Sequence, residues 1–234
     1  MKVVILAGGK GTRFIEETNI KPKPMIEIGG KPILWHIMKR YLSFGIKDFI
    51  ICSGYLSKII EEYFNFNSED WNVEVINTGE DTMTGGRLKK IENLINNETF
   101  CFTYGDTLNN VNISKLINFH KKNSKIATVT VSHPPEKYGV LKIDNFTVTD
   151  FEEKPDRKNE WVNAGYFVLE PAVFDLTLES NTIWENEPMK NLVSKRQLSA
   201  FKHEGFYKSM DSLSDKVFLE NLWNKNNAEW KNWS

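Results

Sequence analysis

Cysteine, excess charge and long apolar runs are all scarce in this chain of 234 residues. Its two cysteines, Cys52 and Cys101, each lie within an apolar run, so we expect two buried thiols rather than a disulfide or metal ligands. The formal net charge is −1, which excludes a global field that would attract nucleic acid or an anionic membrane. No stretch approaches the roughly 18 apolar residues of a membrane span, and the sequence opens on a predicted strand rather than a basic leader. We therefore expect a cytoplasmic protein that binds neither nucleic acid nor membrane.

Clustered histidines are also missing. The four histidines, His36, His120, His133 and His203, show no metal-ligand spacing, and the first two fall within predicted helices. The local sequence contains no Ser-His-Asp or Cys-His arrangement. We therefore expect packing roles for all four.

Short apolar runs alternate with longer helical stretches through the first half of the chain. The pattern predicts strands over 3–7, 48–54, 73–77, 99–106 and 125–132, and helices over 32–45, 56–64, 87–95 and 113–123. After about residue 133 there are short strand-like runs (GVLKI, TVTDFEE, NAGYFVL), a poorly patterned segment over 170–197 and a final helix over 212–224. This order predicts an α/β fold: a Rossmann-like, mixed but mostly parallel sheet with helices on both faces.

The chain ends in a tryptophan-rich tail, AEWKNWS. We expect Trp223, Trp230 and Trp233 to dock this tail on the body of the protein or on another subunit. Stacking on a ligand is the alternative.

A glycine-rich loop, LAGGKGTRF (residues 6–14), follows the first predicted strand. Ligands of open α/β sheets bind beyond the carboxyl ends of the strands, where this loop lies. Glycines allow backbone N–H groups to crowd towards an anion, and an arginine fork suits phosphate. The residues that could do this are Gly8, Gly9, Gly11, Thr12 and Arg13. The loop has neither the Walker pattern nor the dinucleotide fingerprint, and a tight turn without a ligand is the alternative.

A basic segment, KPKP (residues 21–24), follows soon after this loop. Each lysine precedes a proline, which favours extended backbone at Lys21 and Lys23. Two cations held in an extended segment favour an anionic ligand, and a solvated basic loop is the alternative.

Two acidic residues are candidates for a metal site. Asp106 ends a predicted buried strand at the same sheet edge as the glycine loop, and Asp211 precedes the last helix. Mg²⁺ usually takes one or two carboxylates together with substrate phosphates and water. Asp211 could instead cap the helix. The segments MTGGR (83–87) and EEKP (152–155) are interpreted as substrate-facing loops.

Taken in order, AGGKGTR, KPKP, the strand-ending GD, EKP, NAGYFVL and the late MD resemble the sugar-phosphate nucleotidyltransferases over nearly the whole chain. The longer segments EETNIKPKPMIEIGGKPILWHIMK, TGEDTMTGGRLKK and FYKSMDSLSDK are similar to the glucose-1-phosphate cytidylyltransferase branch. The resemblance implies a Mg²⁺-dependent transfer from CTP to a phosphorylated acceptor, with release of pyrophosphate. It also implies a single domain over 1–234, with a nucleotide-binding half over about 1–132, an acceptor-binding half over about 133–234, and assembly as a homo-oligomer.

The roles implied by the resemblance fall on matching positions. The nucleotide would be held by Leu6, Ala7, Gly8, Gly9, Gly11, Thr12, Arg13, Lys23, Arg87 and Asp106. Arg13 and Lys23 would be the catalytic cations, and Asp106 and Asp211 the metal ligands. The acceptor pocket would be lined by Tyr138, Gly139, Glu153, Lys154, Asn163 and Gly165.

The chain departs from this pattern on the acceptor side. The segment between YFNF and TGEDTMTGG is shorter than in the resembling enzymes, GDT replaces GDG, and NAG replaces NGG. We expect the extra methyl group of Ala164 to intrude on the acceptor pocket. The acceptor therefore stays open between glucose 1-phosphate and a non-sugar compound such as phosphorylated glutamine or phosphoramidate, used in capsule decoration. Transfer from a nucleotide other than CTP stays open as well, as does a catalytically silent regulator that binds nucleotide.

Overall fold

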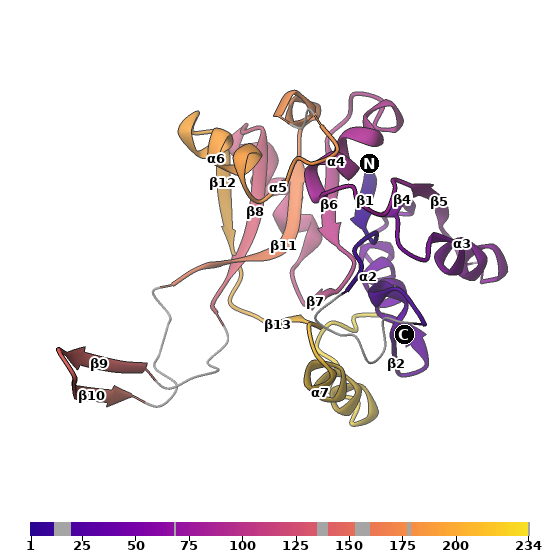
Figure 1. The fold of residues 1–234 in the computed structure, drawn as a ribbon. Helices are drawn as coiled ribbons and strands as arrows, with labels where there is room; N and C mark the ends of the chain where they lie inside the picture. The colour runs from indigo at the N-terminus through magenta and orange to yellow at the C-terminus, as the bar shows by residue number, and fades with distance from the viewer. Residues whose placement is uncertain (12–19, 68, 135–139, 153–159, 177–178, 234) are drawn as a thin grey trace.

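Seven strands form the central sheet of the computed structural model, which describes residues 1–11, 20–67, 69–134, 140–152, 160–176 and 179–233 (Figure 1). The strand order is β12-β8-β11-β6-β1-β4-β5, and β11 runs antiparallel to both of its neighbours, whereas the other pairs are parallel. The bounds are β1 Lys2–Leu6, β4 Asp48–Ser53, β5 Asn72–Asn77, β6 Phe100–Tyr104, β8 Ala127–Ser132, β11 Val162–Leu169 and β12 Leu198–Lys202. The predicted mixed, mostly parallel sheet is confirmed.

Helices cover both faces of the sheet, because successive side chains of each buried strand point to opposite faces. Val3 and Ile5 of β1 belong to one core, and Val4 and Leu6 belong to the other. The first core is covered by α2 Ile33–Leu42, α3 Ser57–Phe66, α5 Ile113–Asn123 and α7 Leu213–Asn224. The second is covered by α4 Thr84–Lys90, α6 Glu187–Ser194, η2 Glu92–Leu94 and η3 Pro171–Leu176. Among the described helices, none is long and apolar enough to cross a bilayer.

Three small antiparallel pairs complete the described strands. They are β2 Glu27–Ile28 with β3 Lys31–Pro32, β7 Thr107–Asn109 with β13 Tyr207–Ser209, and β9 Val140–Asp144 with β10 Thr147–Glu152. The β9–β10 hairpin projects away from the body (Figure 1). The β7–β13 pair brings the segment before α7 alongside the strand that follows Asp106.

The two cysteines are free and buried, as predicted. Cys101 lies in the first core and Cys52 in the second, so the sheet itself separates them. Burial raises the pKa of each thiol to about 12, which makes both poor nucleophiles at neutral pH.

The tryptophan-rich tail docks on the body of its own chain. Trp230 is fully buried in the first core, where its indole N–H donates to Nδ1 of His36 at 3.3 Å. Trp223 stacks on Trp230 with ring centroids 6.4 Å apart. Trp233 also packs against this core. The expectation that the tail docks on the body is confirmed, and all three tryptophan rings serve packing.

The second half of the chain holds the main departures from the predicted elements. Segment 170–197, which lacked a clear pattern, contains η3 and α6, and β12 was not predicted. The helix α6 is short with only two buried residues, and β12 is a partly exposed edge strand, so neither has a strong periodic signal. The helix predicted over 87–95 begins earlier, at Thr84, and ends at Lys90 before η2.

Candidate functional site

A cavity of about 790 Å³ opens beyond the carboxyl ends of β1 and β6. It is lined by residues 6–11, which begin at the last residue of β1, by residues 80–84, which follow β5, and by residues 104–107, which begin at the last residue of β6. Lys23, Arg87, Asn163, Gly165 and Asp211 also reach it. The structure therefore gathers at this cavity every described residue to which the resemblance gave a role. Lys21 of the KPKP segment is not in the lining and instead forms an exposed ion pair with Glu27 at 2.6 Å.

The glycine loop requires glycine for two separate reasons. Gly11 has φ +63°, the left-handed conformation that side chains disfavour. A Cβ on Gly8 would lie 2.1 Å from Nη1 of Arg87, so the loop packs directly on that guanidinium.

Arg87 lies beneath the loops and is only 4% exposed. Its Nη1 donates to the Ser53 carbonyl at 3.0 Å, to the Thr78 hydroxyl at 2.6 Å and to the Gly79 carbonyl at 2.7 Å. Its Nη2 donates to the Gly8 carbonyl at 2.8 Å. Burial lowers the pKa of Arg87 below its ordinary value, but an arginine stays charged. In this structure the guanidinium therefore braces the loops around the cavity, although it also forms part of the lining.

The segment MTGGR was predicted to be a loop, and this is wrong. The helix α4 begins within it, at Thr84. Both glycines lie in this helix, and a neighbouring segment packs so closely against them that a side chain would not fit. A Cβ on Gly85 would lie 2.8 Å from the Thr182 side chain, and one on Gly86 would lie 2.5 Å from the Ser180 carbonyl. Met83, Thr84 and Arg87 still line the cavity, so the segment faces it from the start of a helix.

Lys23 begins a single 3-10 turn, η1 Lys23–Met25, rather than lying in extended backbone. The turn is closed by hydrogen bonds from Met25 N to the Pro22 carbonyl at 2.7 Å and from Ile26 N to the Lys23 carbonyl at 3.1 Å, and these outweigh the bias of the following proline. The preceding residue, Pro22, has extended backbone. The turn presents the Lys23 ammonium to the cavity.

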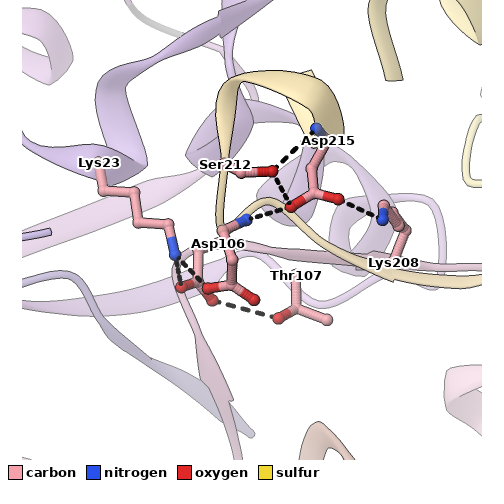
Figure 2. A network of polar contacts seen from close by, with 7 residues as sticks. Lys23, Asp106, Thr107, Lys208, Ser212 and Asp215 are labelled. Carbon is pink, nitrogen blue, oxygen red and sulfur yellow. Dashed lines mark hydrogen bonds and ion pairs between the residues drawn. The ribbon is translucent and has the colours of Figure 1, made fainter. Parts of the chain in front are cut away.

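The Lys23 ammonium joins the two acidic residues of the site, and Figure 2 labels the first of them, Asp106. Its Nζ is 2.8 Å from Oδ2 of Asp106 and 2.7 Å from Oδ1 of Asp211. Burial disfavours the charged lysine, but the two carboxylates outweigh it and raise the pKa of Lys23 above its usual value. The site thus places two carboxylates and one ammonium together at the cavity wall.

These two carboxylates fit a magnesium ion. Mg²⁺ binds through one or two carboxylates and keeps the remaining positions for phosphate oxygens and water. The side chains of Asp106 and Asp211 are 27% and 42% exposed, so both are open to such ligands. The described residues contain no group of three acidic, histidine or cysteine side chains that could hold a metal ion without substrate.

Asp211 does not cap α7. Ser212 is the N-cap, and its hydroxyl accepts a hydrogen bond from the Asp215 backbone N–H. The alternative of a capping role for Asp211 is therefore wrong, and its carboxylate meets Lys23 instead.

The start of β11 also contributes to the cavity, because Asn163 and Gly165 line it. Their role in binding the acceptor stays a prediction. The Asn163 amide donates to the Tyr104 hydroxyl at 3.3 Å, and its oxygen accepts from the Gly165 backbone N–H at 2.8 Å. Ala164, between them, is fully buried and lies outside the described lining. The expected intrusion of its methyl group is wrong, because the side chain is buried at an irregular point of β11, where the register with β8 shifts and Gly165 has φ +76°.

Six predicted site residues lie outside the described residues: Thr12, Arg13, Tyr138, Gly139, Glu153 and Lys154. The EEKP loop falls there too, apart from its first residue. Their roles remain predictions.

The packing roles expected for the histidines agree with the structure. His36 bonds the Ile28 carbonyl at 2.8 Å, and His120 lies between Thr128 and Glu170. His133 packs on Trp161, and His203 bonds the Phe206 carbonyl. None belongs to the described lining of the cavity.

Sequence reasoning missed several lining residues, among them Tyr104, Thr107, Tyr207 and Ser209. Tyr104 could have been found, because it stands two positions before Asp106 at the end of a predicted strand. Tyr207 and Ser209 belong to β13, a strand too short to give a periodic signal.

Comparisons with known proteins agree with this fold. Residues 2–224 match the nucleotidyl transferase family. The chain is 48% identical to glucose-1-phosphate cytidylyltransferase of Salmonella typhi and 40% identical to the probable enzyme of that name from Bacillus subtilis, with 100% of each chain covered. The structure of HddC from Yersinia pseudotuberculosis complexed with GMP-PN superposes with a TM-score of 0.75 at 25% identity, covering 95% of this chain and 99% of that one. The chain belongs to the nucleotidyl transferase family.

Proposed function

We propose that this protein transfers the cytidylyl group of CTP to glucose 1-phosphate, forming CDP-glucose and pyrophosphate. The observation that carries the proposal is the convergence of Lys23, Asp106 and Asp211 at a cavity bounded by the glycine loop. The nucleotide and acceptor are those named for the relatives that align over the full length of this chain.

The chemistry explains why this site has cations and carboxylates, with no histidine or cysteine among the described residues that line the cavity. An oxygen of the acceptor phosphate attacks the α-phosphorus of CTP and forms a new P–O bond. The bond from that phosphorus to the bridging oxygen of the β-phosphate breaks, and pyrophosphate leaves with the electron pair. Because the attacking oxygen is already anionic, no general base is needed. The main barrier is the repulsion between two highly charged phosphates, so positioning and charge neutralisation dominate catalysis.

The residues of the chain then take distinct roles. Lys23 neutralises charge at the reacting phosphates, and Arg13 does so for the triphosphate. Backbone groups of the glycine loop hold the nucleotide, with Arg87 bracing them from below. Asp106 and Asp211 would hold Mg²⁺, which would supply further neutralisation of the triphosphate when bound. Asn163 and Gly165 belong to the acceptor side, together with the predicted Tyr138, Gly139, Glu153 and Lys154.

A panel of nucleotides and acceptors tests the proposal directly. Pyrophosphate release is measured with CTP, UTP, GTP and dTTP, each with glucose 1-phosphate, mannose 1-phosphate or phosphorylated glutamine, in the presence of Mg²⁺. We expect the highest kcat/KM with CTP and glucose 1-phosphate. Release of pyrophosphate only with phosphorylated glutamine would mean that the acceptor is a non-sugar compound. Binding of CTP without release of pyrophosphate in the presence of any of the acceptors would indicate a regulator instead.

The arrangement of the chain into halves and subunits is proposed separately. We infer that residues 1–132 bind mainly nucleotide and residues 133–234 mainly acceptor, and that the chain forms a homo-oligomer. The alignment with the Salmonella typhi relative covers 256 positions, whereas this chain has 234 residues, so that relative carries residues that this chain lacks. Light scattering of the purified protein tests the assembly, and a monomeric mass would contradict it.

A further inference from the structure

Asp215 is a buried carboxylate to which the proposed chemistry gives no role. It stands in the first turn of α7 and is 5% exposed. Its Oδ1 accepts a hydrogen bond from the Lys208 ammonium, and its Oδ2 accepts from the Ser212 hydroxyl at 2.8 Å and from the Asp211 backbone N–H at 3.0 Å (Figure 2). A carboxylate is placed in such a position only when its charge and its lone pairs are matched.

These contacts differ from those of an ordinary helix start. Ser212 already caps α7, and in the usual capping box the acidic residue three positions later bonds the backbone N–H of the cap residue itself. Here the carboxylate of that residue reaches one position further back, to Asp211. The bond therefore fixes the backbone of the residue whose carboxylate meets Lys23.

Lys208 connects this helix start to the other acidic residue of the site. It lies on β13, opposite Leu108 of β7, and β7 begins immediately after Asp106. The Met210 backbone N–H also donates to the Asp106 carbonyl at 2.9 Å. The backbones of Asp106 and Asp211 are thus tied together by one strand pair and one ion pair.

The site needs such a connection because its two carboxylates repel each other. Their oxygens lie 2.8 Å and 2.7 Å from a single ammonium, so the two like charges are neighbours. Outer groups that orient metal ligands commonly change metal affinity or activity by about 10- to 100-fold when they are removed.

We propose that Asp215, paired with Lys208, is a positioning residue that holds Asp211 at the distance from Asp106 that a divalent cation requires. Both carboxylate oxygens of Asp215 are engaged, one by the Lys208 ammonium and the other by the Ser212 hydroxyl and the Asp211 backbone N–H, so its contacts fix it in this position. The inference rests on the proposed function for the identity of the metal ligands.

Direct titration of Mn²⁺ tests the role of Asp215 without relying on turnover. The free-ion signal in electron paramagnetic resonance gives the dissociation constant for Mn²⁺, measured with and without CTP. We expect Asp215→Ala to raise this constant by about tenfold, with binding of metal-free CTP unchanged. In Asp215→Asn, which keeps an oxygen for the Asp211 N–H, most of the affinity should return. Asp215→Ala should have no further effect in an Asp211→Ala background, because the two residues act through one ligand.

A matched helix-cap variant separates positioning from stability. The Asn112 side chain caps α5 by accepting from the Lys115 backbone N–H at 2.9 Å, away from the cavity. Asn112→Ala should lower the melting temperature by about 3 °C and leave Mn²⁺ affinity unchanged.

Three results would overturn the proposal: wild-type protein that binds no Mn²⁺, unchanged Mn²⁺ affinity in Asp215→Ala, or an equal effect of that substitution with and without Asp211. A wild-type protein that binds Mn²⁺, shows the expected shifts and releases no pyrophosphate would support the role of Asp215 and refute the proposed function.

Discussion

Lys23 and Arg87 are two cations on the wall of one cavity, and the structure uses them in opposite ways. The Lys23 ammonium reaches the cavity and forms ion pairs with two carboxylates. The Arg87 guanidinium is bonded to the carbonyls of Ser53, Gly79 and Gly8. A carbonyl oxygen cannot change its charge, so these bonds hold the loops in one arrangement. We conclude that a basic residue beside a phosphate site can be part of the chemistry or part of the scaffold.

The largest expected effect is on turnover, in Lys23→Met. We expect kcat to fall by roughly 10³-fold, about 4 kcal/mol of barrier, because charge at the reacting phosphates is no longer neutralised. The free energy of unfolding should change little, since the ammonium is at the edge of the cavity. Steady-state kinetics and chemical denaturation measure the two quantities. Near-normal kinetics in this variant would refute the catalytic assignment of Lys23.

Arg87→Lys should affect the free energy of unfolding more than turnover, the reverse of Lys23→Met. A single ammonium cannot replace the fork that bonds four carbonyls and a hydroxyl, so unfolding free energy should fall by about 3 kcal/mol. The KM for CTP should rise because the loops loosen, while kcat at saturation stays closer to that of the wild type. An unchanged melting temperature with abolished turnover would mean that Arg87 contacts the nucleotide directly.

His36 offers a test of a buried group in the scaffold far from the chemistry. Burial lowers its pKa from 6.5 to about 4, so protonation of the folded state is disfavoured. The unfolded chain therefore binds more protons than the folded one between these values, and stability falls as the pH drops from 6.5 towards 4. We expect a loss of about 2 kcal/mol between pH 7 and pH 5 from this residue.

Urea denaturation at several pH values, compared with His36→Asn, isolates that contribution. The variant should be less stable at pH 7 but should lose less stability on acidification. Parallel pH profiles for the two proteins would show that His36 is not the group responsible.

Ala164→Gly should have the smallest effect. Because Ala164 is buried away from the described lining, KM for the acceptor should stay within about twofold, and stability should fall by about 1 kcal/mol from the greater freedom of glycine in a strand. Acceptor kinetics and thermal melting check both. A large gain in affinity for glucose 1-phosphate would restore the expectation that this methyl group narrows the acceptor pocket.

The fold could be predicted because its main elements carry strong periodic signals. Buried strands such as 48–53 contain a continuous apolar run, here FIIC. The alternation of such strands with helices predicts a mostly parallel sheet. The same order placed the glycine loop and Asp106 at one sheet edge. The convergence of Lys23 on Asp106 and Asp211 could not be derived from spacing, because it depends on a turn and on a strand of only three residues.

Features that the sequence did not reveal have specific physical reasons. A basic residue after two glycines has the same sequence signature whether it meets an anion or a set of carbonyls, so the burial of Arg87 was not predictable. The shift from a normal capping box at Asp215 is one residue and leaves no trace in the sequence. Ala164 was misplaced because β11 is irregular at this point, where the register with β8 shifts and Gly165 has φ +76°, and sequence spacing does not show which way a side chain faces there.

The measurement that tests the central claim most directly is a ³¹P NMR time course of CTP and glucose 1-phosphate with the protein and Mg²⁺. The account predicts that pyrophosphate and a diphosphate-linked sugar product appear in equal amounts, that neither forms when the acceptor is omitted, and that both are lost in Lys23→Met. Release of inorganic phosphate, or of pyrophosphate without acceptor, would contradict it.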